Sequence, residues 1–226
     1  FIFAYRDDTK YGRRMSEKTA QQILLTDGLM AKAFPINNLS AEKETELPKD
    51  IVKVSDEFAF DFRHAGYMRK GNVFTADVEV QEETPILLGE ILQANVDEKF
   101  YISDERMEKW SYLKGAKKIA RTAANGHEYT FSEGPIAFPD APDKPGRTML
   151  TSESTLNRST HVVADPSTGR LRTLTPVEAE RLQGFEDDWT ATGMPQRMRF
   201  FCMGNALVVP MISRMGKVLD EIVAEE

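Results

Sequence analysis

The chain has 226 residues, 41% of them hydrophobic and 29% charged, which is typical of a folded globular protein long enough to bury a core. The formal net charge of −7 argues against a uniformly basic nucleic-acid binder, although residues 111–175 carry nine Lys or Arg against six Asp or Glu, a local balance of +3. No apolar run approaches the ~20 residues that span a bilayer, there is no signal peptide, and the single cysteine excludes a disulfide framework and fits a reducing cytoplasm.

The start of the chain predicts a strand, a helix and a linker. Residues 1–5 (FIFAY) are apolar and aromatic, as in a core strand. Because such a strand needs neighbours and the chain does not begin with Met, we expect a piece of a longer or processed protein. Residues 16–25 predict a short helix that Ser16 caps and Gly28 stops. The polar stretch 35–50 predicts a solvated linker.

The next stretch predicts a β-hairpin. Residues 58–80 alternate apolar and polar side chains on both sides of a turn at residues 69–72. Residues 85–92 then predict a short helix or an apolar hook, and residues 99–102 predict another strand.

The middle of the chain contains two candidate DNA-binding segments. A helix capped by Ser103 precedes them, and core packing explains its Trp110 and Tyr112 better than base stacking does. Residues 114–122 are basic, which indicates either a solvated face or contact with phosphates. Residues 146–165 are dense in Arg, Thr, Ser and Asn. That composition suits hydrogen bonds to base edges and phosphates, and a Ser/Thr-rich strand pair is the alternative.

The last stretch has the clearest helix signals. Thr175, Pro176 and Glu178 form a capping-box pattern, and Gly184 predicts the end of that helix. The elements expected after it are a loop, a turn and an amphipathic helix, at residues 187–194, 204–205 and 208–222.

The residues contain no complete catalytic or metal-binding constellation. Neither Gly-rich phosphate-binding motif is present, and the three histidines lack metal-ligand spacing. Cys202 lies in the apolar stretch FFCMGN, which favours a buried, inert thiol over a nucleophile. The residues alone predict a non-catalytic portion of something larger.

Three stretches resemble motifs of the cytosine-5 DNA methyltransferases. Residues 172–185 (RTLTPVEAERLQGF) resemble motif IX, residues 204–211 (GNALVVPM) resemble motif X, and FIFAY resembles the strand of motif VIII. The segment between VIII and IX resembles the family's target-recognition domain by position and by its RTMLTSEST run. On this resemblance the chain corresponds to the C-terminal part of such an enzyme.

The departures from the family pattern concern catalysis. The family's Pro-Cys dipeptide, Glu-Asn-Val motif and Phe-x-Gly-x-Gly loop have no counterpart in the chain. The resemblance therefore implies that the nucleophile and most of the S-adenosyl-L-methionine (AdoMet) pocket lie on an N-terminal catalytic domain or a partner subunit outside this chain. We expect the chain to be inactive alone. The alternatives are a non-catalytic DNA-binding subunit of a split methyltransferase and an interaction module with no DNA role.

The resemblance also implies roles for individual residues. The family flips a cytosine out of double-stranded DNA and methylates its C5 from AdoMet. By position, Gly204 and Asn205 should approach AdoMet with Ala206, which stands where the family often has Ser. The expected base-reading residues are Arg147, Thr148, Ser152, Thr155, Asn157 and Arg158. The expected phosphate contacts are Lys114, Lys117, Lys118 and Arg121. Arg172 and Glu178 are expected to pair internally.

The implied fold is α+β, in three segments. An irregular, β-rich target-recognition domain (residues 51–168) is flanked by pieces of an α/β Rossmann-like AdoMet-dependent methyltransferase domain. These pieces are the motif VIII strand with its connector (1–50) and the motif IX helix, loop and motif X helix (169–226). Because the first strand and the last helix both belong to the catalytic half, they should pack on each other or on a second copy in a non-native dimer.

Overall fold

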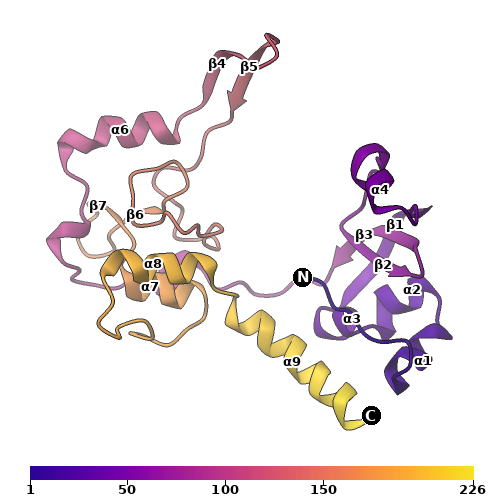
Figure 1. Cartoon of the computed structure of the whole chain (residues 1–226). Coiled ribbons are helices and arrows are strands. Elements are labelled where there is room, and N and C mark those ends of the chain that lie inside the picture. Colours follow the sequence, from indigo (N-terminus) through magenta and orange to yellow (C-terminus); the bar gives the residue numbers. More distant parts are fainter. The chain divides into compact units, whose positions relative to one another are not determined.

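The computed structural model describes residues 1–226, which form two compact units (Figure 1). Unit 1 comprises Phe1–Glu83 and Pro210–Glu226, and unit 2 comprises Thr84–Val209. These boundaries differ from the three predicted segments, which divide the chain by motif rather than by packing. The segments therefore stay a prediction. None of the helices combines the length and the hydropathy of a membrane-spanning segment.

Short helices begin unit 1. They are α1 (Lys10–Ser16), α2 (Ala20–Gln22), a π-helical turn (Ile23–Asp27), α3 (Leu29–Ala33) and, after the first strand, α4 (Ile51–Glu57). The predicted cap at Ser16 is wrong, because Ser16 ends α1 and its hydroxyl donates to the Arg13 carbonyl at 2.6 Å. Thr19 caps the next helix instead, in a capping box with Gln22.

A three-stranded antiparallel sheet completes unit 1. Its strands β1 (Ile36–Glu46), β2 (Ala65–Arg69) and β3 (Asn72–Val80) lie in the order β1-β3-β2. The predicted hairpin is confirmed for β2 and β3, whose turn uses the positive φ of Lys70 and Gly71. The expected strand at residues 58–62 is absent, and its phenylalanine rings pack on one another instead.

The predicted linker at residues 35–50 is wrong, because most of it is β1. This strand pairs with β3 from Ile36 to Glu46, with two irregularities in register. Its side chains are mostly polar and exposed, as an edge strand permits when its backbone alone supplies the pairing. Strand β1 therefore cannot be predicted from a pattern of hydrophobic residues.

Residues near the beginning and the end of the chain pack together in the core of unit 1. Helix α9 (Val209–Ala224) places Val218 and Ile222 against Tyr11 and Met15 of α1. Phe3 and Tyr5 pack on the same cluster, but residues 1–6 form no strand, so that part of the prediction is wrong. The predicted packing of the first residues on the last helix is confirmed.

Unit 2 combines short helices with two small antiparallel pairs of strands. Its helices are α5 (Leu88–Ile91), a 3₁₀ turn (Glu98–Phe100), α6 (Asp104–Lys114), α7 (Pro176–Leu182) and α8 (Gln196–Asn205). Its strands are β4 (Lys117–Thr122), β5 (Glu128–Glu133), β6 (Val162–Ala164) and β7 (Leu171–Thr173), paired β4-β5 and β6-β7. The β4-β5 hairpin extends away from the helices of its own unit (Figure 1).

Several expectations for unit 2 are confirmed and others are wrong. The short helix α5 is present, and the strand expected at residues 99–102 is a 3₁₀ turn followed by a single bridge from Tyr101 to Arg172. Trp110 is buried as expected, whereas Tyr112 is exposed. The strand pair given as the alternative for residues 146–165 is absent: only β6 forms there, and the rest is a loop.

The C-terminal helices follow the sequence signals closely. Thr175 caps α7 in a full capping box with Glu178, and Pro176 is its first residue. The predicted turn at residues 204–205 is wrong, because these residues end α8. Helix α9 is confirmed, with Pro210 in its first turn.

The fold is mixed α and β, with two apolar clusters in unit 2. One cluster contains Phe100, Met149, Ala179, Phe200 and Met203. The other contains Leu88, Ile91, Val163 and Leu174. Helix α7 touches both, so it connects the core of unit 2 to the segment that carries the candidate DNA-binding residues.

Candidate functional site

Arg172, which is fully buried, links several parts of unit 2 through hydrogen bonds. Arg172 on β7 donates from Nη2 and Nη1 to the two carboxylate oxygens of Glu178, at 2.7 and 2.8 Å. Its Nε donates to Asp165 Oδ2 at 2.8 Å. This internal pairing is the one predicted for Arg172 and Glu178.

The same carboxylate also fixes backbone from two other segments. Glu178 accepts the backbone N–H of Gln93 at 2.7 Å and that of Thr175 at 2.8 Å. Each buried charge therefore has several partners, as a buried ion pair requires if it is not to destabilise the fold. Helix α7 and strand β7 are held in one arrangement by this cluster.

Hydrogen bonds also shift the pKa of Asp165. Burial alone would raise it, but the Arg172 guanidinium and the backbone N–H groups of Ser167 and Thr168 bind the ionised form. The net result is a pKa below the ordinary value of an aspartate.

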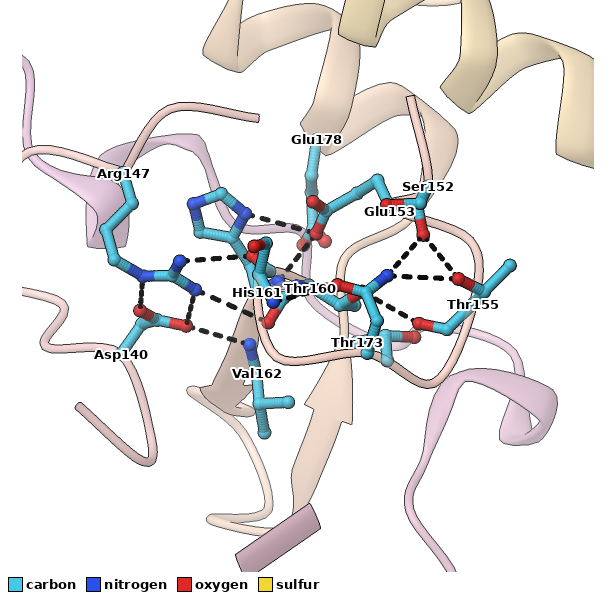
Figure 2. Close-up of polar contacts among 12 residues, drawn as sticks. Asp140, Arg147, Ser152, Glu153, Thr155, Thr160, His161, Val162, Thr173 and Glu178 are labelled. Atoms are coloured by element: carbon cyan, nitrogen blue, oxygen red, sulfur yellow. Dashed lines mark hydrogen bonds and ion pairs between the residues drawn. The ribbon is translucent and has the colours of Figure 1, made fainter. Parts of the chain in front are cut away.

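A second arginine fixes what we call the polar loop, residues 146–161 (Figure 2). Arg147 donates to both carboxylate oxygens of Asp140, at 2.5 and 3.1 Å, and to the carbonyls of Ser159 and Thr160 at 3.0 and 3.3 Å. Asp140 is buried and also accepts the backbone N–H of Val162. Burial would raise the pKa of Asp140, and these hydrogen bonds outweigh it and lower that pKa.

The polar loop also buries a histidine and a glutamate. His161 Nδ1 lies 3.1 Å from Glu153 Oε1, which accepts the backbone N–H of His161 at 2.6 Å as well (Figure 2). Both side chains are almost fully buried. His161 Nε2 and Glu153 Oε2 have no hydrogen-bond partner.

Two further predicted base-reading residues bond to the backbone. Asn157 accepts the N–H groups of Ser159 and Thr160, at 2.8 and 3.2 Å, and donates to the Ser152 carbonyl at 2.9 Å. Arg158 donates to the carbonyls of residues 113, 115 and 134. In this arrangement Arg147, Asn157 and Arg158 are occupied in shaping the loop.

The remaining predicted base-reading residues carry hydroxyl groups. Thr148 and Thr155 are exposed and Ser152 is half-buried. Thr155 donates to the Ser152 carbonyl at 2.8 Å, whereas the hydroxyls of Thr148 and Ser152 make no hydrogen bond within the chain. All six predicted base-reading residues thus lie on the polar loop. Some of their side chains are hydrogen-bonded within the chain, and the hydroxyls of Thr148 and Ser152 are not.

The predicted phosphate-binding residues also divide into two groups. Lys118 and Arg121 are exposed on β4, and Lys117 is half-buried there. Arg121 lies over the Phe131 ring, 4.1 Å from its centroid. Lys114 is different, because it is buried and donates to the Thr160 carbonyl.

Lys114 is therefore placed as a structural residue and not as a phosphate contact. Burial, together with the nearby charges of Arg147 and Arg158, lowers the pKa of its ammonium to about 8. Its sequence neighbours gave no sign of this, because a basic run looks the same whether or not one member turns inward.

The predicted cofactor-binding residues lie at the end of α8. A Cβ on Gly204 would lie 2.4 Å from the Thr151 nitrogen and 2.5 Å from the Leu150 carbonyl carbon, so close packing on the polar loop explains this glycine. Asn205 is exposed, and its Nδ2 donates to the Phe201 carbonyl at 3.0 Å. Its carboxamide oxygen is free at a helix C-terminus, where a cationic group is favoured. The cofactor contact of Asn205 stays a prediction, and Gly204 acts in packing.

Sequence reasoning missed Asp140 and Glu153, which hold the polar loop from inside. Asp140 lies in a proline-rich stretch, and Glu153 lies between serines. An acidic residue within an Arg/Ser/Thr-rich segment is the signal that could have indicated a buried partner for the arginines.

Comparison with known proteins finds a family match over nearly the whole chain. The family model described as C-5 cytosine-specific DNA methylase matches residues 1–221. Type II methyltransferase M.Sau3AI of Staphylococcus aureus is 48% identical over 225 residues, 98% of this chain and 54% of that protein. Type II methyltransferase M.NlaX of Neisseria lactamica is 30% identical over 146 residues, 62% of this chain and 42% of that protein.

The extent of this match corrects one expectation. The chain was expected to correspond only to the C-terminal part of a cytosine-5 methyltransferase, and the family match instead runs from residue 1 to residue 221. The chain spans about half the length of the two curated relatives. Among solved structures, a Dnmt2 methyltransferase of S. pombe has a TM-score of 0.44 at 13% identity, over 83% of this chain and 58% of that one.

Proposed function

This chain belongs to the C-5 cytosine-specific DNA methylase family, and from that premise we propose that the whole protein transfers a methyl group from AdoMet to C5 of a cytosine in a specific duplex sequence. Within that activity, these residues recognise the DNA. We assign the target-recognition domain to residues 51–168, between methyltransferase segments at 1–50 and 169–226. Both relatives are named Type II methyltransferases, which supports a place in a restriction-modification system.

The observation that carries the recognition role is the construction of the polar loop. Buried carboxylates and guanidiniums fix its backbone from inside, while hydroxyls of Thr148 and Ser152 stay unpaired. A site that reads DNA needs donors and acceptors held in place before binding, because ordering them afterwards costs affinity. We assign base contacts to Thr148 and Ser152. The other four predicted residues make hydrogen bonds within the chain and position the loop: Arg147, Thr155, Asn157 and Arg158.

We assign phosphate contacts to the β4-β5 hairpin. Lys118 and Arg121 have no carboxylate partner within 4 Å, and the only ion pair of Lys117 is a long one of 3.8 Å to Glu133. Cations on an extended two-stranded ribbon are well placed to follow a DNA backbone, where such contacts position the protein. Lys114 takes no part, because its ammonium faces the Thr160 carbonyl.

The chemistry of methyl transfer needs groups that these 226 residues do not contain. AdoMet supplies the methyl group when bound, and Asn205 would contact it through its free carboxamide oxygen. The attack on cytosine needs a thiolate, and the family presents it in a Pro-Cys dipeptide. Cys202 follows Phe201, is half-buried and packs against the cluster around Phe200. We therefore propose that this chain alone binds DNA without methylating it.

Fluorescence anisotropy with a labelled duplex tests the binding role. We expect affinity to fall steeply with salt, and replacement of Lys117, Lys118 and Arg121 by Ala to reduce the slope of log K against log salt by about 2.7. The matched control replaces Lys49, Lys53 and Lys217 of unit 1 by Ala, which removes the same charge. Equal loss of slope in both variants would show that the hairpin has no special role.

Transfer of a labelled methyl group tests whether this chain alone methylates DNA. The chain incubated with AdoMet and duplex DNA should leave the DNA unlabelled, and labelled DNA would overturn this assignment. A non-catalytic subunit of a split methyltransferase makes the same prediction, so adding the rest of the protein as a separate polypeptide distinguishes the two: only a subunit of a split enzyme restores labelling in trans.

A further inference from the structure

Lys114 is a buried cation beneath the polar loop with no carboxylate of its own. It ends helix α6, is 1% exposed and makes no ion pair within 4 Å. Its Nζ donates to the Thr160 carbonyl, and Arg147 Nη2 donates to the same oxygen at 3.3 Å. Two cations thus share one neutral acceptor. A buried charge without an ion-pair partner is costly, and the side chain lowers that cost by losing its proton.

The ionisable groups around Lys114 do not remove this cost. They are two carboxylates, two guanidiniums and an imidazole: Asp140, Glu153, Arg147, Arg158 and His161. Arg147 binds both carboxylate oxygens of Asp140, and Glu153 Oε1 is bound by His161, so each carboxylate has another partner. Arg158 Nη1 adds positive charge, because it donates to the carbonyls of residues 113 and 115, on either side of Lys114. Burial and these two guanidiniums lower the pKa of Lys114 to about 8.

Loss of this proton changes the charge beneath the polar loop more than its contacts. A neutral amine still donates a hydrogen bond to the Thr160 carbonyl, and Arg147 keeps its own bond to that oxygen. The loop that carries Thr148 and Ser152, assigned above to base contacts, therefore keeps its shape over an interior that is less positive by one charge. DNA is a polyanion, so this charge favours its binding without touching it.

We propose that Lys114 is a proton-linked switch beneath the polar loop, which binds DNA more tightly when the ammonium is charged than when the amine is neutral. The proposal rests on the DNA-binding function proposed above. The negative charge of the DNA stabilises the ammonium, so binding draws a proton onto Lys114. By the reciprocity of linked equilibria, DNA affinity falls as Lys114 loses its proton.

A titration of the chain without DNA tests whether Lys114 changes charge in this range. Its Nζ lies 5.8 Å from the centre of the Trp110 ring, and a Trp189→Phe variant leaves Trp110 as the sole tryptophan. We expect the Trp110 emission to change with a midpoint near pH 8. Lys114→Met should abolish this change, and Lys109→Met, which removes an exposed lysine of the same helix, should keep it. A flat titration between pH 7 and 9.5 would overturn the proposal.

Urea unfolding gives a second readout, whose sign follows from the two pKa values. The folded-state pKa of Lys114, about 8, lies below the ordinary lysine value of about 10.4, so between them the folded chain binds fewer protons than the unfolded one. The cost of the buried charge is fully present below pH 8 and is relieved as pH rises toward the higher value. The urea midpoint should therefore rise from pH 7 to 9.5 relative to that of Lys114→Met. Midpoints that stay parallel would show that Lys114 keeps its proton.

Fluorescence anisotropy with a labelled duplex at constant salt tests the coupling. We expect the affinity of the unaltered chain to fall by about three- to tenfold from pH 7 to 9, since a pKa change of one unit corresponds to a factor of ten. Lys114→Met should bind with the lower affinity and Lys114→Arg, whose charge persists, with the higher one, both independently of pH. Lys109→Met should keep the pH dependence. Circular dichroism checks that each variant is folded, and the titration of Trp110 in the chain with Lys114 in place needs none of them.

The outcomes distinguish this proposal from the one on which it rests. Salt-dependent DNA binding with the same pH dependence in Lys114→Met would overturn the switch and leave DNA recognition standing. No binding of any duplex by a chain whose Trp110 titrates near pH 8 would overturn the DNA-binding function, and the coupling with it.

Discussion

Arg172 and Glu178 face each other in a two-pronged ion pair from which solvent is fully excluded. The pair joins strand β7 to helix α7 across only five intervening residues. It thereby ties the helix that resembles motif IX to the backbone around the polar loop. The pair therefore fixes the position of α7 relative to the polar loop.

Glu178→Gln should destabilise unit 2 by about 3–5 kcal/mol, because it leaves the buried Arg172 guanidinium with one carboxylate in place of two. Urea unfolding followed by tryptophan fluorescence measures the change. Glu98→Gln is the control, since it breaks the exposed pair with Arg170 and should leave the midpoint almost unchanged. Equal midpoints for both variants would mean that the buried pair contributes nothing.

Stability should fall in acid as Asp165 becomes protonated. The folded-state pKa of Asp165 lies below its ordinary value, so near pH 4 the unfolded chain binds more protons than the folded one. Its contribution is complete above the ordinary aspartate pKa of about 3.9 and is lost as pH falls through the lower, folded value. The urea midpoint of Asp165→Asn should therefore vary less between pH 6 and 3. Asp56→Asn, on the surface of α4, should keep the original pH dependence.

Gly204→Ala and Gly216→Ala should act in opposite directions. A Cβ at position 204 would meet the backbone of residues 150 and 151, which cannot yield as a flexible side chain would, so we expect a loss of about 1–3 kcal/mol. A Cβ at position 216 has no atom within 4 Å, and alanine there should stabilise α9 by up to about 1 kcal/mol. Thermal unfolding compares the two, and stabilisation by Gly204→Ala would contradict the packing described here.

Thr148→Val and Arg147→Lys should distinguish a residue that contacts DNA bases from one that only holds the polar loop in place. Valine removes one exposed hydroxyl, so DNA affinity should fall by about 0.5–1.5 kcal/mol while the urea midpoint stays constant. Lysine cannot reproduce the forked contact of Arg147 with Asp140, so the midpoint itself should fall. If Thr148→Val binds every duplex as the unaltered chain does, Thr148 makes no base contact.

Helix α7 and helix α9 could be predicted because their signals are local. The capping box needs only Thr175 and Glu178, and the amphipathic pattern of α9 needs only its own sixteen residues. The same locality explains the hairpin of β2 and β3. Strand β1 has no local signal in its own residues. Its polar side chains add little stability, and it is held by backbone pairing with β3, which lies far from it in the sequence.

The polar loop is visible in the sequence, but the hydrogen-bond partners of its side chains are not. A segment rich in Arg, Asn and Thr between residues 147 and 158 is visible in the sequence. The inward orientation of Arg147 and Arg158 depends on their hydrogen-bond partners, which lie on segments that only the fold brings together. These partners are Asp140 and the carbonyls of residues 113, 115, 134, 159 and 160. Composition therefore identifies the loop, while burial decides which of its side chains are free.

Unit 1 is closed by the last residues of the chain, since Val218 and Ile222 complete the cluster that Tyr11 and Met15 begin. The core of unit 1 therefore needs residues 210–226 as well as residues 1–83, whereas unit 2, residues 84–209, is one contiguous stretch. Residues 84–209 are thus an inserted cassette with its own core. An exchange of this cassette between related genes would leave the core of unit 1 intact.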